Sequence, residues 1–233
     1  MVNSNLFKQL SLILLLFCTL GVYGQYNNVY NKMQNAKNCF KPLKGSFFDN
    51  VLSKEVNGEK VNYMYIFSNK SIELKYILPQ IDSISDSCDY FLLFNKKFSP
   101  SAYIHDLPAC ELDINSFKLF KGEFNKRSYI LLTAINNGSG KSTTLVFCLL
   151  FDITNHQEVK FFPLWSKYGG TSCFGDFNND GKLDFLKAKE ENNQLKIILM
   201  TLDGEEFRKY DDKHYIIAKK SKSGVRIIKK NWW

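Results

Sequence analysis

The chain has 233 residues, of which 45% are hydrophobic and 15% aromatic, and its formal net charge is +8. This length is sufficient for one sizeable hydrophobic core or two small ones, and the abundance of Phe and Tyr favours β-structure. After residue 24, no apolar run approaches the roughly 20 residues of a membrane-spanning helix, which excludes a helical transmembrane domain from this part of the chain.

Residues 1–24 are predicted to be a signal peptide. Lys8 supplies the basic start, and residues 10–20 supply an apolar segment that is too short for a comfortable membrane span. Cys18 offers a lipoprotein signal as an alternative, although Phe17 before it is larger than the residue usual at that position. The mature protein is therefore expected to be secreted, periplasmic or located on the cell surface.

Residues 25–44 are rich in Asn and Lys and are predicted to be a loosely held lead-in to a single all-β domain over 45–233. Apolar and alternating runs separated by turn residues predict strands throughout this domain. The predicted strands are 62–67 and 71–78 as a first hairpin, 89–94, 129–135 and 144–151 as a second hairpin, 183–188 and 195–202 as a third, and 214–218 and 224–228 in the tail. Residues 96–108 are predicted to be rich in loops.

Two segments follow the same plan, which indicates an internal repeat. The sequence Gly-Glu-Phe-Asn at 122–125 precedes the second hairpin, and Gly-Asp-Phe-Asn at 175–178 precedes the third. Gly122 and Gly175 are 53 positions apart, a spacing typical of propeller blades. We therefore expect an all-β fold of antiparallel hairpins in blade-like repeats of about 53 residues, forming a partial or small β-propeller-like structure, with a β-sandwich as the alternative.

Residues 176–184 carry oxygen-bearing side chains at loop positions 1, 3, 5 and 9, and Gly181 at position 6 permits a sharp turn. Such loops supply a backbone carbonyl at position 7. The predicted ligands of one calcium ion are therefore Asp176, Asn178, Asp180, the carbonyl of Lys182, and Asp184. Lys187 occupies position 12, where an EF-hand requires Glu, and the flanks have strand-like composition. The alternative is a solvated turn between strands.

The run 174–185 resembles the FG-GAP or VCBS-type repeat, and the resemblance extends over about residues 165–207. That repeat forms β-propeller blades in secreted and cell-surface proteins. The resemblance implies that the loop, which matches the repeat's Asp-x-Asn-x-Asp-Gly-x-x-Asp pattern from Asp176 to Asp184, binds calcium.

Five cysteines remain after removal of the signal peptide, and an exported protein can form disulfides between them. They are Cys39, Cys88, Cys110, Cys148 and Cys173. An odd number leaves at least one thiol without an intrachain disulfide. Cys148 lies within the apolar run 145–151, which indicates a buried side chain rather than a reactive one.

The positive charge is concentrated in the tail 213–233, because acidic and basic residues balance in the rest of the mature chain. The basic residues of this tail are Lys213, Lys219, Lys220, Lys222, Arg226, Lys229 and Lys230. The pattern favours an exposed edge hairpin that lysines protect from aggregation. The alternative is that the basic C-terminal tail contacts an anionic surface.

No catalytic motif is recognisable in the sequence. Residues 137–143 resemble a phosphate-binding loop, but Ile135 replaces a required Gly and a strand follows, so we expect no nucleotide. His105, His156 and His214 are far apart and adjoin no nucleophile. The sequence therefore favours a non-enzymatic module that binds a protein or a glycan, and leaves a small exported all-β hydrolase as the alternative.

Overall fold

The computed structural model describes residues 39–43, 52–56, 59–68, 71–77, 90–99, 112–136, 145–192, 194–221 and 224–231. They belong to two compact units, Cys39–Trp165 and Ser166–Trp233, which we call the first and the second unit. The predicted signal peptide, Cys88, Cys110 and the loop 137–143 lie outside the described residues. The expectation of a single domain over 45–233 stays a prediction.

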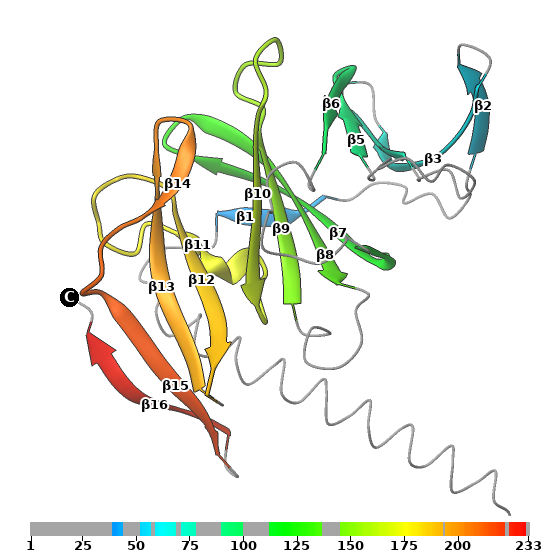
Figure 1. The fold of residues 1–233 in the computed structure, drawn as a ribbon. Coiled ribbons are helices and arrows are strands. Elements are labelled where there is room, and N and C mark those ends of the chain that lie inside the picture. The colour runs from blue at the N-terminus through cyan, green and yellow to red at the C-terminus, as the bar shows by residue number, and fades with distance from the viewer. Residues whose placement is uncertain are drawn as a thin grey trace, which may run out of the picture. The chain divides into compact units, whose positions relative to one another are not determined.

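The predicted all-β fold is confirmed (Figure 1). The described segments form antiparallel strands, with a short 3-10 turn at Thr171–Cys173. None of the described segments forms a helix with the length and hydropathy needed to cross a membrane.

The first unit contains two five-stranded sheets. Their strands are β1 (Phe40–Pro42), β2 (Leu52–Val56), β3 (Glu59–Ser68), β4 (Glu73–Ile77), β5 (Tyr90–Leu93), β6 (Lys96–Phe98), β7 (Leu112–Phe124), β8 (Arg127–Asn136), β9 (Leu145–Asp152) and β10 (Lys160–Lys167), whose last two residues already belong to the second unit. One sheet has the order β1-β7-β8-β9-β10, and the other, which is strongly curled, has the order β2-β3-β4-β5-β6 (Figure 1).

Aromatic side chains pack these two sheets against each other. The ring of Tyr76 on β4 lies 5.3 Å from that of Phe117 on β7, and Phe91 on β5 lies 6.4 Å from Phe151 on β9. Every residue of β9 is buried, as its apolar run predicts, and Cys148 is 0% exposed. The apolar area removed from water between the sheets is the main source of stability in this unit.

The second unit contains one six-stranded sheet. Its strands are β11 (Phe174–Gly175), β12 (Asp184–Glu191), β13 (Gln194–Asp203), β14 (Glu206–Lys209), β15 (Tyr215–Ser221) and β16 (Gly224–Asn231). The order is β11-β12-β13-β15-β16, and β14 also pairs with β13. The hydroxyl of Ser166 covers part of the open edge of β12, because it donates to the carbonyl of Leu186 and accepts from the backbone N–H of Ala188.

The three predicted hairpins are formed by β3–β4, β8–β9 and β12–β13, and the predicted tail strands extend the last sheet as β15 and β16. Other strands were not expected. β1 forms within the predicted lead-in, β6 within the predicted loop, and the sequence pattern does not indicate β10 or β14. Consecutive strands are mostly neighbours in all three sheets, which agrees with both the propeller-like and the sandwich alternative.

Candidate calcium site

The candidate loop, residues 176–183, connects β11 to β12 in the second unit. Its two ends are held together because Gly175 is paired with Asp184 and Phe174 with Phe185. Both phenylalanine side chains are fully buried, and their ring centroids lie 5.0 Å apart. Within the loop, Phe177 and Leu183 are also buried. The apolar residues between the predicted ligands therefore anchor the loop to the core.

Hydrogen bonds join three of the predicted ligands in one turn. The backbone N–H of Asp180 donates to Asp176 Oδ1 at 3.0 Å and to Asn178 Oδ1 at 3.1 Å. The N–H of Gly181 donates to Asp176 Oδ2 at 3.0 Å, and Asn178 Nδ2 donates to Asp180 Oδ2 at 2.9 Å. The side chains at loop positions 1, 3 and 5 therefore all take part in hydrogen bonds within this turn.

The backbone of this turn requires the residues that the sequence provides. Asn179 has φ = 60° and Gly181 has φ = 79°, both in the left-handed region that Asn and Gly tolerate best. Lys182 extends away from the turn, because its Nζ lies 3.7 Å from Asp203 and about half of its side chain is exposed. The backbone carbonyl is therefore the group that Lys182 would offer to an ion.

Asp184 differs from the other predicted ligands because it is 0% exposed. Its Oδ2 accepts the N–H of Phe177 at 2.8 Å, and its Oδ1 accepts the hydroxyl of Thr201 at 2.6 Å. Burial, assisted by the negative charges of Asp180 and Asp176, raises the pKa of this carboxyl to about 6, despite the opposing effect of both hydrogen bonds.

Asp184 forms no ion pair with a Lys, Arg or His side chain in the described part of the chain. A buried ionised carboxylate is unfavourable unless a cation compensates its charge. The second unit therefore contains a buried acidic group, close to two further aspartates, that a bound cation would stabilise.

The carboxylates of the loop do not already converge on one point. Among the described residues, no three His, Cys, Asp or Glu side chains are close enough together to hold a metal ion. The oxygens nevertheless suit calcium, because each carboxylate oxygen of Asp176, Asp180 and Asp184 accepts one hydrogen bond and keeps a second lone pair. Asp176, Asn178, Asp180, Asp184 and the carbonyl of Lys182 would hold the ion, and this ligand set stays a prediction.

Comparison with known proteins yields no match, whether with family models, curated proteins or solved structures. The interpretation of the loop therefore rests on the residues themselves and on the repeat that they resemble.

The first unit also contains a buried carboxylate, Asp152, but strand register matches it to Thr201 and matches Tyr129 to Asp184. Gly122 is paired with Tyr129 and Tyr129 with Asp152, just as Gly175 is paired with Asp184 and Asp184 with Thr201. Asp152 is 6% exposed, and the guanidinium of Arg127 lies 3.6 Å from its Oδ2.

The segment that connects Gly122 to Tyr129 in the first unit is shorter than the segment that connects Gly175 to Asp184 in the second. Residues 123–128 continue the ladder around a tight turn at Asn125 and Lys126, both at positive φ, whereas residues 176–183 leave the ladder and form the open loop. Two additional residues therefore distinguish the candidate calcium loop from an ordinary hairpin.

Sequence reasoning missed Thr201, Asp152 and Arg127. Thr201 could have been found from the third hairpin, because a tight turn near residue 192 sets a register that places Thr201 opposite Asp184. Of the three histidines, His105 lies outside the described residues, and the other two contact neighbouring side chains. His156 stacks on Phe94 with centroids 4.3 Å apart, and His214 Nδ1 lies 2.5 Å from Asp211 Oδ2.

Proposed function

We propose that this protein is an exported, non-enzymatic β-repeat protein that acts as a binding module and whose loop at 176–184 holds one structural calcium ion. The buried carboxylate of Asp184 is the observation that carries the proposal. It lies next to a turn that gathers the oxygens of Asp176, Asn178 and Asp180, and it forms no ion pair within the described chain.

The proposed ion is structural, because its ligands join strands. Asp184 is the first residue of β12, its hydrogen-bond partner Thr201 lies on β13, and the other ligands belong to the loop that follows β11. An ion at this position would hold three strands of one sheet together. A ligand that binds only the folded state stabilises it by about 2.7 kcal/mol at 100 times its dissociation constant.

Thermal unfolding in calcium and in chelator tests this role. A stabilisation of about 2.7 kcal/mol should raise the melting temperature of a chain of this size by roughly 5–10 °C. Limited proteolysis should show calcium-dependent protection concentrated at residues 171–202.

Asp212→Ala is the matched control, because Asp212 is 91% exposed and lies outside the loop. Calcium should stabilise this control as much as the wild type. Equal melting curves with and without calcium, for a protein that binds the ion, would exclude the structural role.

Export rests on the N-terminal sequence. We expect cleavage after Gly24, so that the mature protein begins at Gln25. Mass spectrometry of the N-terminus of exported protein tests this expectation. A lipid-modified Cys18 would contradict it and would indicate a membrane-anchored protein instead.

A further inference from the structure

The sheet of the second unit has one buried face and one partly exposed face. Alternate residues such as Ala188 on β12, Ile197 on β13 and Ile216 on β15 are fully buried. The residues between them lie on the opposite face and are half-buried. We call six of them the lysine face: Lys187, Lys189, Lys196, Ile198, Tyr215 and Ile217.

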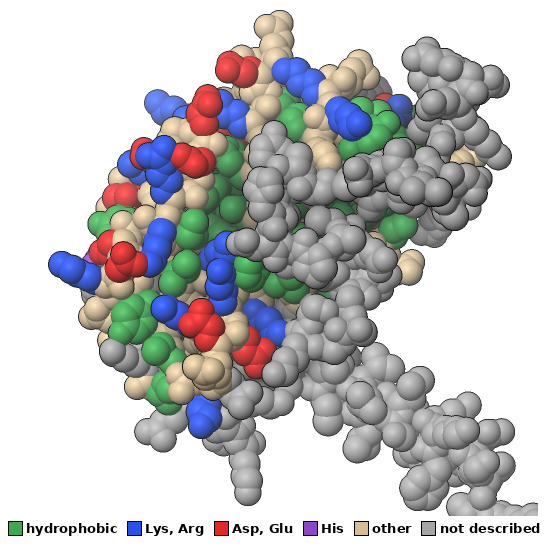
Figure 2. Space-filling view, in the orientation of Figure 1, with side chains coloured by type: hydrophobic (Ala, Val, Ile, Leu, Met, Phe, Trp, Pro, Cys, Tyr) green, Lys and Arg blue, Asp and Glu red, His purple; other side chains and the backbone are tan. Residues whose placement is uncertain are grey.

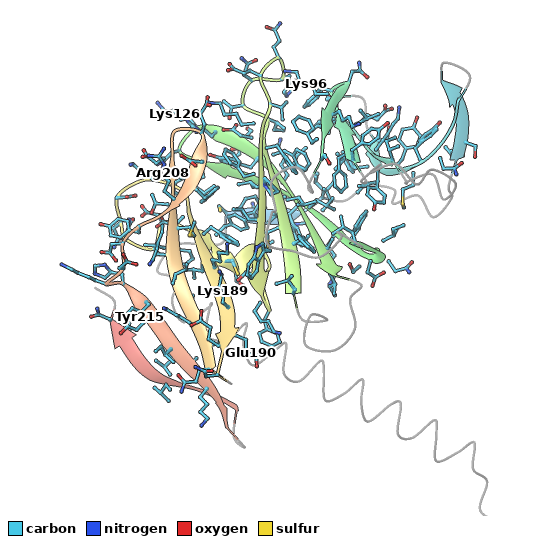
Figure 3. The ribbon with its side chains drawn as sticks, viewed as in Figure 1. Lys96, Lys126, Lys189, Glu190, Arg208 and Tyr215 are labelled. Carbon is cyan, nitrogen blue, oxygen red and sulfur yellow. The ribbon has the colours of Figure 1, made fainter. Side chains whose placement is uncertain are left out.

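Strand register places these six side chains in two adjacent rows. Lys187 is paired with Ile198, and Ile198 with Tyr215. In the next row Lys189 is paired with Lys196, and Lys196 with Ile217. Paired residues on neighbouring strands are about 5 Å apart. Figure 2 shows green hydrophobic side chains among blue basic and red acidic ones on this part of the molecule, and Figure 3 labels Lys189, Glu190 and Tyr215.

This combination of charges is produced by folding. Lys187, Lys189 and Lys196 belong to the charge-balanced part of the sequence, yet the sheet brings them beside β15, whose Lys219 is exposed. Lys196 Nζ lies 5.8 Å from the ring centroid of Tyr215, which confirms that both side chains share this face. Glu191, at the end of β12, is exposed beside these lysines, and the lysines of these strands outnumber the acidic residue on this face.

Protection of an open sheet edge does not explain the whole set. Lysines commonly protect edge strands from pairing with other chains. Lys196, however, lies on β13, which is paired with β12 on one side and with β15 on the other. Ile198 and Ile217, which flank it, are half-buried aliphatic residues. A purely protective surface would not need such residues between its charges.

We propose that the lysine face binds the surface of an anionic phospholipid bilayer. A flat cationic sheet face can approach many headgroups at once, and each lysine close to an anionic membrane strengthens binding about fivefold. Ile198 and Ile217 would reach the boundary between headgroups and acyl chains, where apolar side chains and Tyr are favoured. A polyanion such as a nucleic acid or a sulfated glycan would not use these aliphatic residues. A nucleic acid would also find only one aromatic ring of the lysine face to stack on, that of Tyr215.

This inference names a partner for the binding module proposed above, but it does not use the calcium loop. The predicted calcium ligands are not part of the lysine face. Vesicle binding measured in chelator therefore tests the lysine face alone, and a failure of calcium binding would leave its result unchanged.

The experiment is sedimentation of the mature protein with vesicles, in chelator and at low salt. Vesicles of phosphatidylcholine with about 30% phosphatidylserine, which serves as a generic anionic phospholipid, are compared with vesicles of phosphatidylcholine alone. We expect binding only to the anionic vesicles, and a decrease as salt is added. Lys189→Gln combined with Lys196→Gln should weaken binding about 25-fold. The matched control combines Lys118→Gln with Lys121→Gln, two exposed lysines of β7, and should bind like the wild type.

The contribution of the aliphatic residues separates a membrane from a polyanion. Ile198→Ser should weaken vesicle binding without changing the far-ultraviolet circular dichroism. Retention on immobilised heparin without vesicle binding would overturn the proposal in favour of a polyanion. Equal weakening by the Lys118 and Lys121 control would also overturn it, because net charge rather than the lysine face would then account for binding.

Discussion

Gly122 on β7 is a position where the structure predicts that a single methyl group destabilises the protein. A Cβ atom at residue 122 would lie 2.7 Å from Cδ1 of Phe40 and 2.9 Å from the carbonyl oxygen of Cys39. Phe40 is only 4% exposed, and the carbonyl belongs to Cys39, the residue directly before the strand that pairs with β7, so neither neighbour can move away easily. Gly122→Ala should therefore separate β1 from β7.

Two opposing effects determine how much Gly122→Ala lowers the free energy of unfolding. Overpacking of a well-packed site costs about 1–3 kcal/mol, whereas replacement of Gly by Ala reduces the entropy of the unfolded chain and returns about 0.4–1 kcal/mol. The net loss in free energy of unfolding should be about 1–2 kcal/mol. Gly175→Ala, the equivalent change in the second unit, is the matched control. Its Cβ would lie 3.4 Å from the ring of Phe177, which is an ordinary contact, so stability should be unchanged or slightly higher.

Urea denaturation followed by circular dichroism measures both variants. Gly122→Ala should lower the midpoint while leaving the slope of free energy against urea concentration unchanged. Phe40→Leu, added to Gly122→Ala, should recover part of the loss because a smaller side chain then faces the new methyl group. If Gly122→Ala is as stable as Gly175→Ala, the packing of β1 on β7 described above is wrong.

Two further predictions concern buried polar groups. Thr201→Val removes the hydroxyl that donates to Asp184 Oδ1, so the free energy of unfolding in chelator should fall by about 1–3 kcal/mol. Thr133→Val is the control at another buried threonine. It should cost less, because the hydroxyl of Thr133 is 3.4 Å from its acceptor. Burial raises the pKa of Tyr129 from its ordinary value of 10.0 to about 12, so above pH 10 the unfolded chain loses a proton that the folded chain keeps. Stability should therefore fall as the pH rises from 10 to 12, and the same urea titrations on Tyr129→Phe should show a smaller fall; identical pH profiles would contradict this assignment.

The parts of the fold that could be predicted are those determined by local patterns. The hairpins β3–β4, β8–β9 and β12–β13 consist of alternating or apolar runs on either side of turn residues, so neighbouring segments alone indicate them. β7 was not predicted, and a register shift between Asp113 and Lys118 interrupts its alternation. β10 contains Pro163, which argues against a strand, and β1 depends on pairing with a segment about 80 positions away.

The candidate site could likewise be predicted only in the features that depend on local sequence spacing. The odd spacing of Asp176, Asn178 and Asp180, with Gly181 after them, indicates a calcium loop, and in the structure these side chains accept hydrogen bonds within one turn. The burial of Asp184 and its bond to Thr201 depend on the register between β12 and β13, which is a tertiary property. The arrangement of the lysine face also depends on register, since its lysines come from two strands and its neighbouring aliphatic residues from two.

The central claim, that residues 176–184 bind calcium, is tested most directly by isothermal titration of the mature protein with calcium. We expect one ion per chain for the wild type and for the control Asp212→Ala. Asp180→Ala, which removes an exposed carboxylate and should leave the fold intact, should bind at least roughly tenfold more weakly because the ion loses one charged ligand. The absence of calcium uptake by the wild type, or equal uptake by the wild type and Asp180→Ala, would contradict the account.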